Sequence, residues 1–296
     1  MSTHFVRESL IDPRIAPSAV PLGWRRALFP SPAIGVLSLA LLALLVIFGW
    51  RFVQWAVVHA HWLGESSEAC PGEIGACWAF VTARWKPLLG GFLLTFVVTL
   101  ATFVTAFPIG LSLALGRRSR LPIVRWLCTA FIEGMRAVPL LAVLFIAATL
   151  LPLFLPTGYT MNLFWRAVVA FALFNAAMAA DVFRGGLQAV GHGQIEAATT
   201  VGLSDFASLR LIVLPQAITA VVPALANIMI AVIKETTLLS IVGVSDLLGS
   251  VEIGAKSPAW IGEPNILTSG YVFLAAIYLI VCYGLSRYSR RLEARR

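Results

Sequence analysis

Long, uninterrupted apolar runs recur along this chain. Six of them exceed the roughly 20 residues that an α-helix needs to cross the hydrocarbon layer of a membrane. Transmembrane β-strands instead alternate apolar and polar residues over about ten positions, so these unbroken runs exclude a β-barrel. The expected spans are residues 33–58, 88–115, 126–151, 163–187, 217–242 and 266–286. The runs therefore predict an all-α polytopic membrane protein with about six transmembrane helices.

Composition supports the same class of protein. Of 296 residues, 59% are hydrophobic and only 12% are charged, and the mean hydropathy is +0.88. A chain with so little polar surface cannot cover a soluble globule of this size.

The net charge of +8 is distributed unevenly about the expected spans. With a cytosolic N-terminus, fourteen arginines fall inside: 7, 14, 25, 26, 117, 118, 120, 125, 210, 287, 290, 291, 295 and 296. Five basic residues fall outside: Arg51, Arg84, Lys86, Arg166 and Lys256. The positive-inside rule therefore predicts that both termini are cytosolic. A nucleic-acid-binding protein is disfavoured, because no basic patch is interleaved with stacking aromatic residues.

The first apolar run is expected to be an uncleaved anchor rather than a signal peptide. Its 32-residue flank is long and contains five prolines, and the run lacks a clear small-x-small cleavage site. The expected organisation is a cytosolic tail (1–32), an extra helix with a periplasmic loop (33–87), a core (88–290) and a basic cytosolic C-terminus (291–296). Cys70 and Cys77 share that loop, where a disulfide and two free thiols are both open alternatives.

The segment "EAATTVGLSDFASLRLIVLP" interrupts two apolar runs on the expected cytosolic side. A short helix is expected to end at Gly202, which supplies a left-handed residue. Ser204 then caps a second helix with Asp205 in its first turn, and Pro215 either ends that helix or begins the fifth span. This pattern predicts a rigid cytosolic protrusion that another protein grips; a merely structured loop is the alternative.

The same segment resembles a known motif. Glu196, Ala197 and Ala198 are followed after three residues by Gly202, and after nine more by Ile-x-Leu-Pro ending at Leu214 and Pro215. This spacing is similar to the EAA loop in permease subunits of binding-protein-dependent ABC importers.

The resemblance extends over residues 88–290 and favours the polar amino-acid subfamily. The segments that carry it are "FIEGMRAVPLLAVLF", "DVFRGGLQAVGHGQIEAA" and "IKETTLLSIVGVSDLL". The extra first span and the loop "SSEACPGEIGACWAF" further resemble one permease of the general L-amino-acid importers. Two positions differ from the pattern of that subfamily: Asp181 stands where Glu is common, and Ala137-Val138 replaces a usual Gly-Thr. The resemblance therefore does not identify the transported substrate.

The resemblance implies a type I ABC importer permease fold in a bacterial inner membrane. Such a subunit pairs with a second, homologous permease, two ATP-binding subunits and a periplasmic amino-acid-binding protein. It binds no cofactor, and ATP is hydrolysed on the partner subunits. The residues expected to couple to the ATPase are Glu196, Ala197, Ala198, Gly202, Leu214 and Pro215.

Charged residues within the spans are costly and should face the protein interior. Glu133 and Arg136 are three residues apart on the third span, and a straight helix places Arg136 near the bilayer centre. Candidates for the substrate pathway are Glu133, Arg136, Asn227, Lys234 and Thr236. Asp181 and Arg184 are expected to form a structural ion pair. A packing role is an equally open alternative for Glu133, Arg136 and Lys234, and also for Asn227 and Thr236, which could hydrogen-bond between helices.

Two other functions compete with this interpretation. An ion-coupled secondary transporter of small polar solutes would need an internal repeat, and comparison of the two halves reveals none. An intramembrane enzyme would need a motif such as His-Glu-x-x-His or Gly-x-Ser-x-Gly, and no such motif, metal-binding cluster or phosphate-binding loop occurs. The sequence therefore predicts no catalytic or metal-binding residue.

Overall fold

The computed structural model describes residues 31–72, 74–156 and 158–293. It divides into two compact units, Met1–His59 and Ala60–Arg296. Except for Ser31 and Pro32, the predicted cytosolic tail lies outside the described residues, as do the last three residues of the predicted basic C-terminus.

The first unit contains one long helix. α2 spans Pro32–Val53 and continues as a π-helical turn over Gln54–Val58. The Ser31 hydroxyl accepts a hydrogen bond from the Ile34 amide at 3.3 Å and so caps the first turn. Together the two segments form an apolar span of 27 residues, which confirms the predicted first span.

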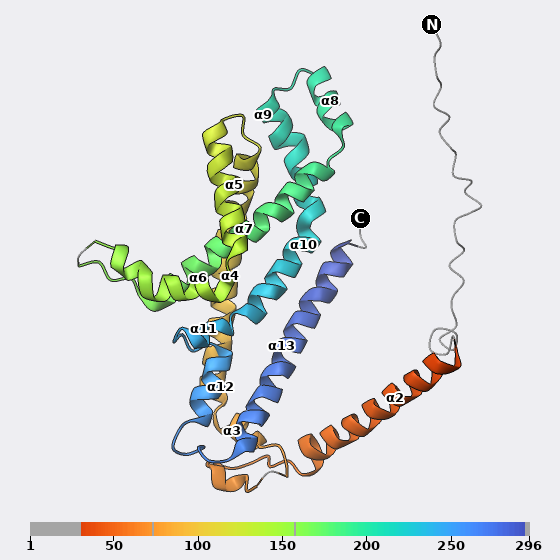
Figure 1. The fold of residues 1–296 in the computed structure, drawn as a ribbon, viewed down its shortest axis with the longest axis vertical. Coiled ribbons are helices and arrows are strands. Elements are labelled where there is room, and N and C mark those ends of the chain that lie inside the picture. The colour runs from red at the N-terminus through yellow and green to blue at the C-terminus, as the bar shows by residue number, and fades with distance from the viewer. Residues whose placement is uncertain (1–30, 73, 157, 294–296) are drawn as a thin grey trace. The chain divides into compact units, whose positions relative to one another are not determined.

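The second unit is built from helices that run between two ends (Figure 1). One end carries α8 and α9, and the other carries α3 and α12; they are called the α8 end and the α12 end below. The helices are α3 (Trp78–Ala83), α4 (Trp85–Arg117), α5 (Pro122–Ala137), α6 (Leu140–Phe145), α7 (Leu163–Ala189), α8 (His192–Thr200), α9 (Asp205–Ser208), α10 (Leu214–Glu235), α11 (Leu238–Ile241), α12 (Leu247–Ala255) and α13 (Pro264–Glu293). Shorter helical turns cover Ser67–Ala69, Ile146–Leu150, Leu151–Phe154 and Leu209–Val213.

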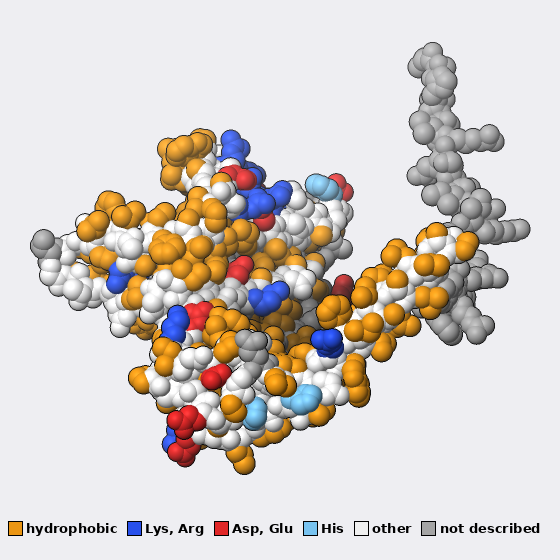
Figure 2. All heavy atoms as spheres, turned by 60° about the horizontal axis from the view of Figure 1, so that its bottom comes forward, with side chains coloured by type: hydrophobic (Ala, Val, Ile, Leu, Met, Phe, Trp, Pro, Cys, Tyr) orange, Lys and Arg blue, Asp and Glu red, His pale blue; other side chains and the backbone are white. Residues whose placement is uncertain are grey.

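Four segments of this unit are long and apolar enough to cross a membrane. They are Trp85–Arg117, Leu163–Ala189, Asp205–Ile241 and Pro264–Arg291. Hydrophobic side chains cover large parts of the surface in Figure 2, as expected for helices in contact with lipid rather than water. With α2 these segments confirm five predicted spans and the all-α polytopic fold class.

The third predicted span is wrong as a single helix. α5 ends at Ala137 and α6 starts at Leu140, and the two parts of this span are bent by 104°. Pro139 lacks an amide proton and disfavours a helical backbone at the preceding residue. Val138 is accordingly extended, with φ −104° and ψ 136°. Arg136 therefore lies in the last turn of α5 rather than midway along a straight helix.

α7 is the central helix of the bundle and contacts α4, α5 and α10. Its buried face is rich in alanine, which allows neighbouring helices to approach closely. A Cβ atom added to Gly110 of α4 would lie only 2.8 Å from the carbonyl oxygen of Ala176. The packing of α4 on α7 therefore depends on small residues on both helices.

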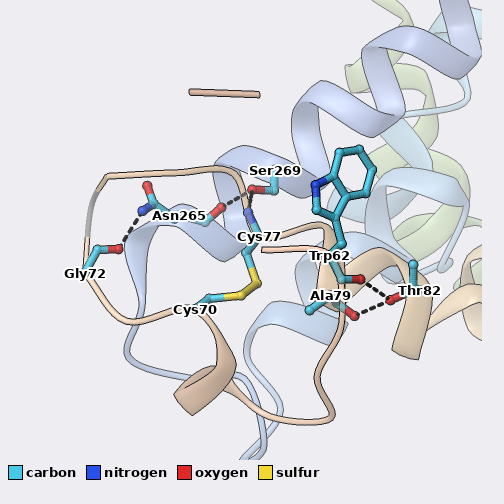
Figure 3. The surroundings of a disulfide bond; sticks show 8 residues. All are labelled: Trp62, Cys70, Gly72, Cys77, Ala79, Thr82, Asn265 and Ser269. Carbon is cyan, nitrogen blue, oxygen red and sulfur yellow. Dashed lines mark hydrogen bonds between the residues drawn. A yellow bond between two sulfur atoms is a disulfide. The ribbon is translucent and has the colours of Figure 1, made fainter. Parts of the chain in front are cut away.

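The loop before α3 is attached to the start of α13 at the α12 end (Figure 3). Within this loop Cys70 and Cys77 form a disulfide. The Cys77 amide donates a hydrogen bond to the buried Ser269 hydroxyl at 2.7 Å, and the Asn265 side-chain amide donates to the carbonyl of Gly72 at 2.6 Å. The loop is thus cross-linked internally and hydrogen-bonded to a membrane helix.

Thiol labelling tests this disulfide. In a chain with Cys128→Ser and Cys282→Ser, a maleimide reagent added after denaturation in SDS is expected to label no cysteine before reduction and two after it. Denaturation is needed because both cysteines are buried in the folded protein. In the chain-entropy picture, a bridge closing so short a loop stabilises the fold by about 2.5 kcal/mol, so reduction should also lower the melting temperature. Labelling without reductant would show that the two thiols are free.

Asp246 caps α12 from a fully buried position. One carboxylate oxygen accepts a hydrogen bond from the Gly249 amide at 2.9 Å, whereas the other accepts none within the described part of the chain. Burial raises the pKa of Asp246 from 3.8 to about 6, because the loss of hydration outweighs the amide hydrogen bonds. The folded protein therefore holds this proton more tightly than the unfolded chain does.

Asp246→Asn is expected to remove part of the pH dependence of stability. Stabilisation from a raised carboxyl pKa is complete below the unfolded value of 3.8 and is lost as the pH rises through about 6. The free energy of unfolding of the wild type should fall by about 3 kcal/mol across this pH window because of Asp246. The variant lacks this contribution. Thermal unfolding in detergent at about pH 4 and about pH 7 measures the difference. An identical pH dependence in the two proteins would contradict the assignment.

Candidate functional site: the α8–α9 protrusion and a charged cluster

The segment 191–213 at the α8 end is called the α8–α9 protrusion. Gly202 closes α8 with φ +85°. The Leu203 amide donates to the carbonyl of Ala198 and the Gly202 amide to that of Thr199, both at 3.0 Å. These two bonds are typical of a helix that ends in a left-handed residue. They confirm the predicted end of the first short helix.

The second short helix also begins as predicted. The Ser204 hydroxyl accepts a hydrogen bond from the Ala207 amide at 3.3 Å and caps α9, with Asp205 in the first turn. α9 then continues through a π-helical turn into α10, and Pro215 lies in the first turn of α10. Pro215 was predicted either to end the second short helix or to begin the fifth span. The structure supports the second alternative, because Pro215 lies in the first turn of α10.

The outer surface of the protrusion combines small, charged and apolar residues. Glu196 and Ala197 of α8 are exposed, whereas Ala198 of the same helix is buried. Two apolar side chains that the sequence analysis did not single out are strongly exposed, Val201 at 81% and Phe206 at 71%. Leu214 is half-buried and Pro215 exposed at the base of the protrusion. Exposed apolar groups on a rigid projection are typical of a protein-binding surface.

Five charged side chains from three helices form a charged cluster: Arg117 of α4, Glu133 and Arg136 of α5, and Asp181 and Arg184 of α7. Asp181 lies at its centre, 2.6 Å from Arg136 and 3.5 Å from both Arg117 and Arg184. Glu133 pairs with Arg117 at 2.9 Å and with Arg136 at 3.6 Å. Three guanidinium groups thus share two carboxylates, which leaves an excess positive charge.

The cluster unites residues that the sequence analysis had placed in two separate pairs. Arg136 and Asp181 join the two pairs directly, and Arg117, expected only as one of the arginines of the inner side, contacts one carboxylate of each pair. No sequence signal points to it, because Arg117 is 16 residues from Glu133 and 64 from Asp181. Only the packing of α4 against α5 and α7 brings these side chains together.

The other proposed pathway residues lie on α10 or just after it. Asn227 and Lys234 are exposed, and their spacing of seven residues places them on one face of the helix. Thr236 is fully buried, and its hydroxyl donates to the carbonyl of Ile233 at 2.8 Å. Within the described residues, Lys234 forms no ion pair with the charged cluster, so the predicted pathway residues do not form one contiguous group.

Comparison with known proteins places this arrangement in a family. Residues 106–296 match the family model described as the binding-protein-dependent transport system inner membrane component. The chain is 34% identical to the inner membrane amino-acid ABC transporter permease protein YhdY of Escherichia coli K12, over 92% of this chain and 91% of that protein.

Two further matches agree. The chain is 41% identical over 69% of its length to BztC of Rhodobacter capsulatus, a glutamate/glutamine/aspartate/asparagine transport system permease, of which it covers 46%. The fold is similar to that of an amino acid ABC transporter crystallised with histidines, with a TM-score of 0.65 and 29% identity over 73% of this chain and 97% of the other. The chain therefore belongs to the family of inner membrane components of binding-protein-dependent transport systems, the permeases of ABC importers.

Proposed function

We propose that this permease imports amino acids and that the α8–α9 protrusion couples it to an ATP-binding subunit. The observation that carries the coupling role is the protrusion itself, a capped helical pair whose exposed tip bears Val201 and Phe206. The substrate class is supported by relatives named as amino-acid permeases.

In this proposal the α8 end faces the cytosol of a bacterium, and both termini lie on that side. The assembled importer contains a second, homologous permease, two ATP-binding subunits and a periplasmic amino-acid-binding protein. This chain carries no cofactor, because ATP is bound and hydrolysed by the partner subunits.

Coupling requires that movement of the ATPase is transmitted to the membrane helices, so the α8–α9 protrusion between them must be rigid. α9 supports this, because it continues through a π-helical turn into α10. Arg120 also pairs with Asp205 at 2.8 Å, although both side chains are exposed and the pair adds little stability. Closure of the ATPase dimer would then displace α10 together with the protrusion and switch the pathway between its inward-open and outward-open states.

The pathway itself is proposed to use Glu133, Arg136, Asn227, Lys234 and Thr236. A zwitterionic amino acid needs a cation for its carboxylate and an anion for its ammonium group when it leaves water. Arg136 and Glu133 offer both charges within one turn of α5. Asp181 is proposed to hold α7 against α5 through Arg136, and Arg184 to balance its charge within α7, rather than to contact substrate.

Reconstituted vesicles distinguish this function from an ion-coupled secondary transporter. The permease complex, purified with its partners, should take up amino acid only when ATP and the loaded binding protein are present. Uptake driven by a sodium or proton gradient without ATP would contradict the proposal.

A further inference from the structure

We propose that a cavity at the base of α8 binds a phosphate group. The cavity has a volume of about 440 Å³ and lies where the end of α4, the last part of α7 and the start of α8 meet. Its polar lining consists of Arg117, Arg118, Arg184, Gln188 and His192.

The charges around this cavity favour an anion. The described residues that line it include three arginines and neither Asp nor Glu. Arg118 forms no ion pair within 4 Å in the described part of the chain. The Nε of Arg184 lies 3.5 Å from Asp181, and Arg117 pairs with Glu133 at 2.9 Å. The carboxylate of Asp181, 3.5 Å from Arg117 and Arg184, is shared with Arg136. The three guanidinium groups of the charged cluster still outnumber its two carboxylates, and the guanidinium of Arg118 adds a further positive charge that is available to a ligand.

The N-terminus of α8 supplies a second, independent attraction. α8 has nine residues, its N-cap is Gly191, and neither a capping side chain nor an acidic residue occupies its first turn. Val190 and His192, on either side of Gly191, both line the cavity. Free amide groups and the helix dipole at such an end attract negative charge.

A phosphate group suits these donors better than a carboxylate. Its oxygens point in several directions, so it can accept hydrogen bonds from arginines on α4 and α7 and from the start of α8 at once. The cavity also has an apolar part formed by Leu187 and Ile195. The phosphate can therefore belong to a free ion or to the headgroup of an anionic phospholipid, whose organic part would lie against these side chains.

A bound phosphate would join α8 to the ends of α4 and α7. The consequence for transport rests on the proposed function: occupancy would restrain the coupling helix and alter the ATP-driven uptake rate. Binding itself does not depend on that function, because all the donors belong to this chain.

Thermal unfolding of the full-length chain in a non-ionic detergent tests the site. Inorganic phosphate is compared with chloride at equal ionic strength, and phosphatidylglycerol with phosphatidylcholine. A rise in melting temperature with inorganic phosphate supports a site for the free ion, and a rise with phosphatidylglycerol alone supports a lipid headgroup. No rise with either ligand beyond its control would overturn the proposal.

Variants give the test its specificity. Arg118→Gln should weaken binding about tenfold, because it removes one charge-assisted contact from an exposed residue without breaking an ion pair. Arg125→Gln is the matched control, since Arg125 is exposed on α5 but does not line the cavity. If Arg118→Gln lowers the melting temperature of the protein without ligand, the test uses His192→Ala instead, because His192 also lines the cavity. Equal weakening in Arg125→Gln would indicate non-specific attraction and contradict the site.

The two proposals can fail separately. The binding measurement uses the chain without any ATPase, so its failure leaves the coupling role intact. Conversely, loss of the coupling role would leave phosphate binding unchanged and would remove only its predicted effect on uptake.

Discussion

Gly202→Leu is expected to reduce ATP-driven amino-acid uptake at least about tenfold while the permease remains folded in the membrane. Gly202 has φ +85°, and a side chain with a Cβ in the left-handed region costs about 1–2 kcal/mol. The two backbone hydrogen bonds that end α8, from the amides of residues 202 and 203, should be distorted. The coupling helix then no longer holds one orientation. Uptake into vesicles, measured at matched permease content, gives the result.

Gly202→Asn is the matched control, because asparagine adopts the left-handed conformation more readily than leucine. It should retain most of the uptake. Glu196→Lys, which reverses an exposed charge on α8 without straining the backbone, should abolish uptake as Gly202→Leu does. Normal uptake in both Glu196→Lys and Gly202→Leu would defeat the coupling role.

Arg136→Gln is expected to reduce uptake about tenfold and to change stability by only about 1 kcal/mol. The Arg136 side chain is 42% exposed, so its pairing with Asp181 at 2.6 Å is partly screened by its surroundings. Its loss removes the cation that the proposed pathway offers to a substrate carboxylate, while Glu133 keeps its closer contact with Arg117 at 2.9 Å. Uptake and the yield of assembled complex are measured on the same preparation.

Arg184→Gln serves as the comparison, because Arg184 contacts Asp181 only at 3.5 Å and is assigned to helix packing. Its effect on uptake should be no larger than its effect on assembly. If Arg136→Gln also lowers uptake and assembly equally, the charged cluster is structural and the pathway lies elsewhere.

Apolar runs and helix-capping residues in the sequence predicted the positions of many of the helices. The first span follows from one apolar run, and the structure has it as a 27-residue helical segment. Gly202 and Ser204 were identified correctly because caps depend on residues only a few positions apart. The bend after α5 had an equally local signal in Pro139, but the surrounding apolar run was given more weight.

Contacts between distant segments were not predictable in the same way. Arg117 joins the charged cluster only because α4 packs on α5 and α7, and no spacing rule relates it to Asp181. The exposure of Val201 and Phe206 likewise depends on how the α8–α9 protrusion leaves the bundle. Hydrophobic patterns identify which residues are apolar, but the tertiary fold decides which of them remain uncovered.

Cross-linking from the tip of the protrusion tests the coupling role most directly. In a chain with Cys128→Ser and Cys282→Ser, Ala197→Cys introduces a thiol at an exposed position of α8, and Ile74→Cys introduces one in the loop at the opposite end. A bifunctional thiol reagent applied to the assembled complex should link position 197, but not position 74, to an ATP-binding subunit. If position 197 is cross-linked to no other subunit, or is labelled from the periplasmic side in intact cells, the α8–α9 protrusion does not couple the permease to an ATP-binding subunit.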